Sequence, residues 1–224
     1  MSPDTLRDAC RKIRHVALDM DGTIYMGSEL FPFTKEFLAL LDDNGISYSF
    51  LTNNPTKSIA DYLDKLRKMG IEASPDNMYT TAVATIDYLR ANMPDVNRLF
   101  VVGTPSMKAE FEQAGFSLTA PSADDIPQAL VVAFDTTLDY ERLCHASWLA
   151  SQPIPYIATN PDRVCPTNLP TVLVDCGSLC ACIEHAVGRR PDIVIGKPNP
   201  DMLSGIRFRL GLQPDEIAMC GDRI

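Results

Sequence analysis

The sequence lacks long apolar runs. Even a strongly hydrophobic stretch such as residues 129–134 is far shorter than the roughly 18 residues that a membrane-spanning helix needs. Residues 1–14 alternate charged and apolar side chains and lack the apolar centre of a signal peptide. We therefore expect a protein that works in water and has no membrane partner.

Positive charge is also scarce, with 20 Lys and Arg against 29 Asp and Glu and a formal net charge of −9. This excess of negative charge repels phosphate backbones, so binding to nucleic acid is not expected, although a local basic site is compatible with the net charge.

The seven cysteines are an odd number and do not form the paired framework of a secreted scaffold. The spacing of Cys176, Cys180 and Cys182 is not that of zinc ligands, and we interpret these residues as small buried side chains on a helix. Together these features predict a cytoplasmic protein.

Short β-rich apolar runs alternate with amphipathic segments of helical length, which is typical of parallel strands joined by crossover helices. The predicted strands span residues 15–19, 47–52, 98–102, 130–134, 156–159, 171–174, 193–195 and 216–220. The predicted helices span residues 34–44, 57–69, 82–92, 105–114, 140–151, 178–187 and 200–210. So many strands are unusual for one sheet in a chain of this length, and the sequence predicts an α/β protein with two domains.

Two carboxylates, Asp19 and Asp21, stand at the end of the first predicted strand and are followed by Gly22 and Thr23. In open parallel sheets, ligands bind at the carboxyl ends of the strands. One carboxylate is suited to attack phosphorus and carry the phosphoryl group, and the other to exchange protons with the leaving alcohol and with water. When these residues are considered without the rest of the sequence, a solvated Asp-Gly turn explains them as well as a catalytic site does.

A second polar segment, Thr52 with Asn53 and Asn54, follows the second predicted strand. A threonine hydroxyl and backbone N–H groups at the start of a helix suit an anion such as phosphate. An N-cap with an Asx turn before the next helix is the better explanation of this segment alone.

Two further strand ends carry charge. Lys197 follows Gly196, where a cation would neutralise phosphate and nucleophile together, although the spacing is not that of a P-loop. Asp222 follows Gly221 and would complete a Mg²⁺ site, because Mg²⁺ prefers one or two carboxylates with carbonyl, water and phosphate oxygens. A surface lysine and a capped turn are the simpler explanations of each one alone. Chance explains poorly that four such strand ends occur in order along one chain.

Taken in order, these residues resemble the four motifs of the haloacid dehalogenase superfamily of phosphatases. The NagD-like branch, which includes p-nitrophenyl phosphatases and phosphoglycolate phosphatases, is the most similar, and the similarity covers almost the whole chain. The phrases that carry it are Leu51-Thr52-Asn53-Asn54-Pro55, Val101-Val102-Gly103, Ala158-Thr159-Asn160-Pro161-Asp162, Cys176-Gly177-Ser178-Leu179 and Ile195-Gly196-Lys197-Pro198.

The resemblance implies a Rossmann-like parallel-sheet core with an inserted α/β domain, a C2-type cap. It places the core at residues 1–81 and 188–224 and the cap at residues 82–187, which accounts for the surplus strands. In the family the chain continues after the fourth motif with a second acid, a helix and a further strand. We therefore expect the C-terminal part of the core to be truncated in a sequence that ends at Ile224.

The resemblance also implies roles for single residues. Asp19 is the nucleophile and a ligand of Mg²⁺, and Asp21 is the general acid and base whose backbone carbonyl also binds the metal. Thr52 and Lys197 hold the phosphoryl group, and Asp222 completes the metal sphere. The residues implied to contact the substrate are Gly22, Thr23, Asn53, Asn54, Asn160 and Asp162. Dehalogenases of the superfamily have no acid at the position of Asp21, so ester hydrolysis is favoured.

The sequence therefore predicts Mg²⁺-dependent hydrolysis of a small phosphorylated metabolite through an aspartyl-phosphate intermediate. Sugar phosphates, phosphoglycolate, nucleotides and p-nitrophenyl phosphate all remain as substrates, because the loops of the cap decide the choice. A phosphometabolite-binding protein without turnover and a phosphotransferase are the alternatives. A homodimer formed through the cap is compatible with the sequence but is not supported by any particular residue.

Overall fold

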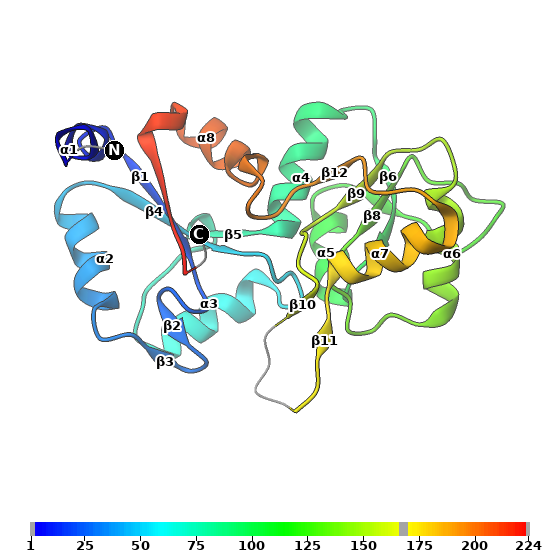
Figure 1. The fold of residues 1–224 in the computed structure, drawn as a ribbon, viewed down its shortest axis with the longest axis horizontal. Helices are drawn as coiled ribbons and strands as arrows, with labels where there is room; N and C mark the ends of the chain where they lie inside the picture. The colour runs from blue at the N-terminus through cyan, green and yellow to red at the C-terminus, as the bar shows by residue number, and fades with distance from the viewer. Residues whose placement is uncertain (1–2, 166–169, 223–224) are drawn as a thin grey trace. The chain divides into compact units, whose positions relative to one another are not determined.

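The computed structural model describes residues 3–165 and 170–222, and contacts within the chain divide it into two compact units. The first unit comprises Met1–Thr52, Ile59–Tyr79 and Gly205–Ile224, and the second comprises Asn53–Ser58 and Thr80–Ser204. Figure 1 shows the helices and strands of each unit along the chain. Within the described ranges, no helix is both long and apolar enough to cross a membrane. The assignment of residues 82–187 to a cap domain stays a prediction.

The sheet of the first unit has four strands in the order β13-β1-β4-β5. These are β1 (His15–Asp19), β4 (Ser47–Thr52), β5 (Met78–Thr80) and β13 (Ile217–Cys220). The inner strand β1 pairs in parallel with both β13 and β4, with Leu18 opposite Cys220 and Asp19 opposite Leu51. This register brings the carboxyl ends of the three strands to one edge of the sheet, as expected for a parallel arrangement.

Apolar side chains of β1 stabilise the first unit. Val16 and Leu18 of the strand and Met20 just beyond it are buried on one side, and Ala17 between them is buried as well, so β1 is covered on both faces. The first three share a cluster with Leu38 of α2 (Thr34–Asp43) and Leu66 of α3 (Ile59–Lys68). Burial of one such leucine contributes about 1.5–3 kcal/mol. The strand that carries Asp19 at its end is therefore firmly fixed.

The sheet of the second unit has five strands in the order β12-β9-β8-β6-β7, and each neighbouring pair is parallel. The strands are β6 (Arg98–Val102), β7 (Ser117–Leu118), β8 (Ala129–Val132), β9 (Tyr156–Ala158) and β12 (Ile193–Val194). The order matches a common doubly wound α/β arrangement, and the predicted fold class is confirmed. Because β9 and β12 are neighbours, the segments that follow them, with Asn160 and Lys197, leave the sheet side by side.

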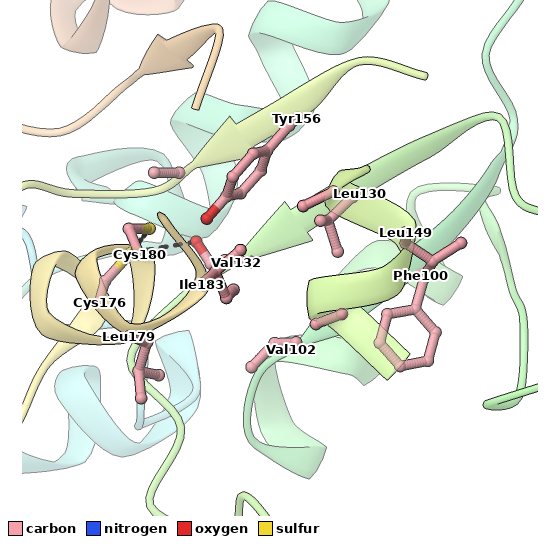
Figure 2. Close-up of a cluster of buried hydrophobic side chains, with 13 residues drawn as sticks. Phe100, Val102, Leu130, Val132, Leu149, Tyr156, Cys176, Leu179, Cys180 and Ile183 are labelled. Carbon is pink, nitrogen blue, oxygen red and sulfur yellow. Dashed lines mark hydrogen bonds between the residues drawn. The ribbon is translucent and has the colours of Figure 1, made fainter. Parts of the chain in front are cut away.

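Helices surround this second sheet. They are α4 (Thr81–Asn92), α5 (Pro105–Gln113), α6 (Tyr140–Ala150) and α7 (Cys176–Val187). Figure 2 shows side chains of β6, β8 and β9 packed with those of α6 and α7 in one apolar cluster. The Cys176 thiol donates a hydrogen bond to the carbonyl oxygen of Val132, with an Sγ–O distance of 3.1 Å. The prediction of buried helical cysteines is confirmed for Cys176 and Cys180, whereas Cys182 is exposed.

The short elements were not predicted from the sequence. They are α1 (Pro3–Cys10), β2 (Tyr25–Met26), β3 (Glu29–Leu30), η1 (Pro75–Asn77), β5, β7, β10 (Val164–Cys165) and η3 (Pro214–Glu216). The strand predicted at residues 171–174 is shortened to β11 (Leu173–Val174), which pairs antiparallel with β10 and lies outside both main sheets. Two-residue strands bury too few side chains to leave a periodic pattern in the sequence.

Side-chain caps explain where two helices differ from the prediction. The helix expected at residues 178–187 begins at Cys176, because the Asp175 carboxylate accepts the first free N–H group. The helix expected at residues 200–210 begins as the 3₁₀ turn η2 (Pro200–Leu203) and continues as α8 (Ser204–Leu210). The Asn199 side chain caps that turn by accepting a hydrogen bond from the N–H of Asp201 at 3.0 Å.

Candidate functional site

The carboxyl end of β1 carries Asp19 and Asp21. The backbone turns directly after the strand, since the N–H groups of Thr23 and Ile24 both donate to the carbonyl oxygen of Met20, at 3.2 and 3.0 Å. The Asp19 carboxylate accepts a hydrogen bond from the N–H of Met20 at 2.9 Å. The Asp21 side chain, in contrast, is 61% exposed. The turn therefore gives the two carboxylates different surroundings, which suits separate chemical roles.

Two residues that the sequence did not reveal contact Asp21. The Tyr25 hydroxyl donates to Asp21 Oδ2 at 3.3 Å, and Lys65 Nζ lies 3.8 Å from Asp21 Oδ1. Lys65 Nζ also lies 3.7 Å from the centroid of the Tyr25 ring. Burial, and secondly the charge of Asp21, raises the pKa of Tyr25, so its hydroxyl stays a proton donor. Lys65 belongs to the distant α3, and only the folded arrangement identifies it.

Gly22 allows the ends of β1 and β13 to approach closely, whereas a side chain at Gly221 would make only ordinary van der Waals contacts. A Cβ atom on Gly22 would lie 2.7 Å from Asp222 Oδ2, and the backbone φ of +85° at this position also favours glycine. A Cβ atom on Gly221 would lie 3.8 Å from Asp19 Oδ2. The Asp19 and Asp222 carboxylates therefore belong to one small region of the first unit.

The donors in this region fit a magnesium ion. Among the residues described, no group of three or more His, Cys, Asp or Glu side chains is placed to hold a metal. Mg²⁺ needs only one or two carboxylates, completed by carbonyl, water and phosphate oxygens, and Asp19 and Asp222 meet this need. Thr23 follows Asp21 by two residues. Its hydroxyl oxygen is buried and has no hydrogen-bond partner within the described structure, which leaves it available to a ligand.

Thr52 ends β4 and is buried, with 4% of its surface exposed. Its strand pairs with β1 so that Leu51 lies opposite Asp19. Thr52 is thus one residue beyond the level of Asp19 at the same edge of the sheet, where its predicted contact with a phosphoryl group would be made. The division between the two units falls directly after it, before Asn53.

In the second unit, the Asn53 side chain holds the backbone of Lys197. The Lys197 N–H donates to Asn53 Oδ1 at 3.0 Å, and Asn53 Nδ2 donates to the Lys197 carbonyl oxygen at 3.2 Å. Gly196 makes this approach possible, because a Cβ atom there would lie 2.8 Å from Asn53 Oδ1 and 2.7 Å from the Thr159 carbonyl oxygen. The paired bonds fix the lysine backbone much as a strand partner would.

Asn160 and Asp162 belong to the same network. Asn160 is fully buried, and its Nδ2 donates to the Asn53 carbonyl oxygen at 2.9 Å. Asp162 Oδ2 accepts a hydrogen bond from Asn53 Nδ2 at 3.0 Å. Asn54 instead forms a local turn, since its Oδ1 accepts from the N–H of Thr56 at 2.9 Å. The contacts that these three side chains are predicted to make with substrate stay predictions.

The predicted site residues thus form one group in each unit. The first unit holds Asp19, Asp21, Gly22, Thr23, Thr52 and Asp222. The second unit holds Asn53, Asn54, Asn160, Asp162 and Lys197. Parallel pairing organises the first group, and side-chain hydrogen bonds organise most of the second.

Known proteins resemble this chain over most of its length. Residues 16–117 match the family model of haloacid dehalogenase-like hydrolases. The acid sugar phosphatase of Staphylococcus epidermidis is 32% identical over 205 residues, which cover 92% of this chain and 77% of that protein. The structure of the 4-nitrophenylphosphatase of Thermotoga maritima is 37% identical with a TM-score of 0.87, covering 96% of this chain and 80% of its own. NagD from E. coli K-12 is 29% identical with a TM-score of 0.83, covering 94% and 80%.

The chain therefore belongs to the haloacid dehalogenase-like hydrolase family. Its structural neighbours place it in the NagD-like branch of that family, as the sequence motifs predicted, and it is an enzyme of the phosphatase class.

Proposed function

We propose that this protein hydrolyses small phosphate monoesters with Mg²⁺, through an aspartyl-phosphate intermediate on Asp19. The parallel pairing of β1 with β4 and β13 is the observation that supports this most directly. It sets Asp19 at the same sheet edge as Thr52 and Asp222, which combines a nucleophile, a hydroxyl donor and a second acid. Bound Mg²⁺, held by Asp19, Asp222 and the Asp21 carbonyl, would supply positive charge that offsets the negative charge of ester and nucleophile.

The reaction has two steps in this proposal. A carboxylate oxygen of Asp19 forms a bond to phosphorus while the bond from phosphorus to the alcohol oxygen breaks, and Asp21 gives that oxygen a proton. A water molecule then attacks the phosphorus and passes a proton to Asp21, while the bond between Asp19 and phosphorus breaks. This second step releases phosphate and restores the Asp19 carboxylate. Tyr25 and Lys65 hold the Asp21 carboxylate for both transfers. Thr52 and Lys197 bind the phosphoryl oxygens.

Relatives support the substrate class. Their names include an acid sugar phosphatase and p-nitrophenyl phosphatases. We extend this to sugar phosphates, phosphoglycolate, nucleotides and p-nitrophenyl phosphate as candidate substrates, with residues 82–187 as the cap that selects among them. The proposed setting is the cytoplasm, and a homodimer is compatible with it.

Metal dependence and product analysis test this proposal together. We expect p-nitrophenyl phosphate hydrolysis to fall to the uncatalysed rate when a chelator removes Mg²⁺ and to return when Mg²⁺ is restored. With methanol as a competing acceptor, the released phosphate should equal the released nitrophenol. A deficit of phosphate would instead identify a phosphotransferase. Absence of turnover at saturating Mg²⁺ would favour the phosphometabolite-binding alternative.

Removal of the Tyr25 hydroxyl tests its role beside Asp21. We expect Tyr25→Phe to lower kcat by about fivefold, because one hydrogen bond to the acid/base carboxylate is lost. The free energy of unfolding should change by less than about 1 kcal/mol, since the buried ring remains. Steady-state kinetics and urea unfolding measure both. Tyr48→Phe, which removes a hydroxyl from β4 away from Asp21, is the control and should leave kcat unchanged.

A further inference from the structure

Two cysteine thiols lie together inside the second unit and have no part in the proposed reaction. Cys176 and Cys180 are four residues apart on α7, so their side chains occupy the same face of the helix. Their Sγ atoms are 4.0 Å apart, and both side chains are buried in the apolar cluster of Figure 2. The helix therefore holds two neighbouring thiols away from water.

The helix also keeps these two thiols from joining in an unstrained disulfide. Cβ atoms four residues apart on a helix are about 5–6 Å apart, whereas a disulfide needs them about 3.5–4.5 Å apart. The start of α7 is held in place, because the Asp175 carboxylate accepts from the Cys176 N–H at 2.6 Å and the Gly177 N–H donates to the Asp162 carbonyl oxygen at 2.8 Å. A bound ion can connect the sulfur atoms without distorting this turn.

The separation of the sulfur atoms suits a soft metal ion. Bonds from a metal of this size to thiolate sulfur are about 2.3 Å long, so two of them that span 4.0 Å meet at about 120°. This angle is trigonal. Cu(I) prefers thiolate ligands and is stable with two or three of them, whereas structural zinc takes four. Within residues 3–165 and 170–222, no third His, Cys, Asp or Glu side chain completes the pair, which favours Cu(I) over zinc.

The same cluster contains a buried hydroxyl group that lacks a partner. Tyr156 of β9 is fully buried, and its hydroxyl has no hydrogen-bond partner in the part of the chain that the structure describes. In Figure 2 its ring extends from β9 towards Cys180. Burial raises the pKa of Tyr156, so the hydroxyl keeps its proton. A proton donor at this place suits a pair of thiolates, which carry more negative charge than one Cu(I) ion neutralises.

A cavity gives an ion a route to the pair. It has a volume of about 250 Å³, and its lining includes Cys180 and Glu184 of α7 together with Arg190 and Val194. Its rim reaches the surface, because the Arg190 side chain is 79% exposed and its Nε donates to the Glu184 carboxylate at 2.5 Å. Cys180 is the thiol that lines the cavity, so an entering ion meets Cys180 first and Cys176 behind it.

We propose that Cys176 and Cys180 form a binding site for Cu(I), with the Tyr156 hydroxyl as a hydrogen-bond donor to a ligand sulfur. Each thiol loses its proton as its sulfur bonds to the ion, so one Cu(I) binds and two protons are released, without any change of oxidation state. The Cys176 thiol then gives up its hydrogen bond to the Val132 carbonyl oxygen. This site lies wholly in the second unit and does not depend on the proposed hydrolysis.

Titration of the reduced protein with Cu(I), against a chelator that competes for the ion, tests the ligands. We expect one tightly bound ion per chain. Cys176→Ser and Cys180→Ser should each weaken binding by about 100-fold or more, because one of two ligands is lost. Tyr156→Phe should weaken it by about tenfold, as is typical when a group that supports a metal ligand is removed. Cys182→Ser, which changes an exposed thiol of the same helix, is the matched control and should bind as the wild type does.

A second variant avoids any change inside the cluster. With the exposed Cys10, Cys144 and Cys182 all replaced by Ser, the buried pair remains intact. X-ray absorption of its Cu(I) complex should show two sulfur neighbours at about 2.3 Å. Fewer than two sulfur neighbours, or loss of tight binding in this variant, would overturn the proposal, and so would wild-type affinity in a folded Cys180→Ser protein. Hydrolysis of p-nitrophenyl phosphate is not measured in these experiments, so their outcome leaves the proposed function to its own test.

Discussion

Asp19→Asn is expected to lower the rate of p-nitrophenyl phosphate hydrolysis by about 10⁴-fold or more. The amide keeps the size of the side chain but cannot attack phosphorus, and loss of a nucleophile typically costs this much or more in kcat. The fold should persist, because Asp19 lies at the end of β1 and outside the apolar cluster formed by that strand. Release of nitrophenol at saturating substrate and Mg²⁺ measures the loss.

Asp43→Asn is the matched control, since Asp43 is an exposed acid at the end of α2 in the same unit. It should retain wild-type activity. Trapping of the phosphorylated enzyme gives an independent check, because acid quenching during turnover should preserve a phosphorylated peptide that contains residues 15–19. If Asp19→Asn keeps more than a tenth of the wild-type rate, Asp19 is not the nucleophile.

Gly177→Ala is expected to destabilise the second unit by about 3 kcal/mol, with a corresponding fall in the thermal unfolding midpoint. The added Cβ atom would meet the carbonyl oxygens of Pro161 and Asp162 at 2.3 and 2.9 Å, and these backbone atoms cannot move aside cheaply. Helix propensity alone predicts the opposite sign, because alanine is better than glycine in a helix by about 1 kcal/mol.

Ala181→Gly on the exposed side of the same helix measures that propensity separately and should cost about 1 kcal/mol. Differential scanning calorimetry of both variants separates steric from intrinsic effects. A stabilised Gly177→Ala protein would show that the loop before Arg163 shifts freely, which contradicts the close approach described above.

The main helices and sheet strands were predictable because they bury enough side chains to leave a pattern in the sequence. The apolar run Val16-Ala17-Leu18 illustrates this, since a short continuous apolar run is typical of a strand that is buried on both faces. The order of the strands was not predictable in the same way, because pairing depends on contacts between distant segments. The ribbon of β10 and β11 was missed for a related reason: two residues per strand carry too little pattern.

The residues of the candidate site also fall into those that the sequence predicted and those that only the folded structure identifies. Asp19, Asp21, Lys197 and Asp222 were found because each follows an apolar strand within a recognisable motif. Tyr25 and Lys65 were missed, since their importance comes only from their distance to Asp21 in the folded chain. The buried hydrogen bonds of Asn160 likewise have no signature in the sequence, which suggested only a contact with substrate.

The distribution of free thiols gives each unit its own chemical reporter. Cys220 is half-buried against the apolar cluster of the first unit, whereas Cys176 and Cys180 are buried in the cluster of the second. Maleimide reagents will modify Cys10, Cys144 and Cys182 at once, because these side chains are exposed. Slower labelling of Cys220 then reports the rate at which the first unit opens, and labelling of the pair on α7 reports the rate for the second. Mass spectrometry can follow both rates in a single sample without an engineered cysteine.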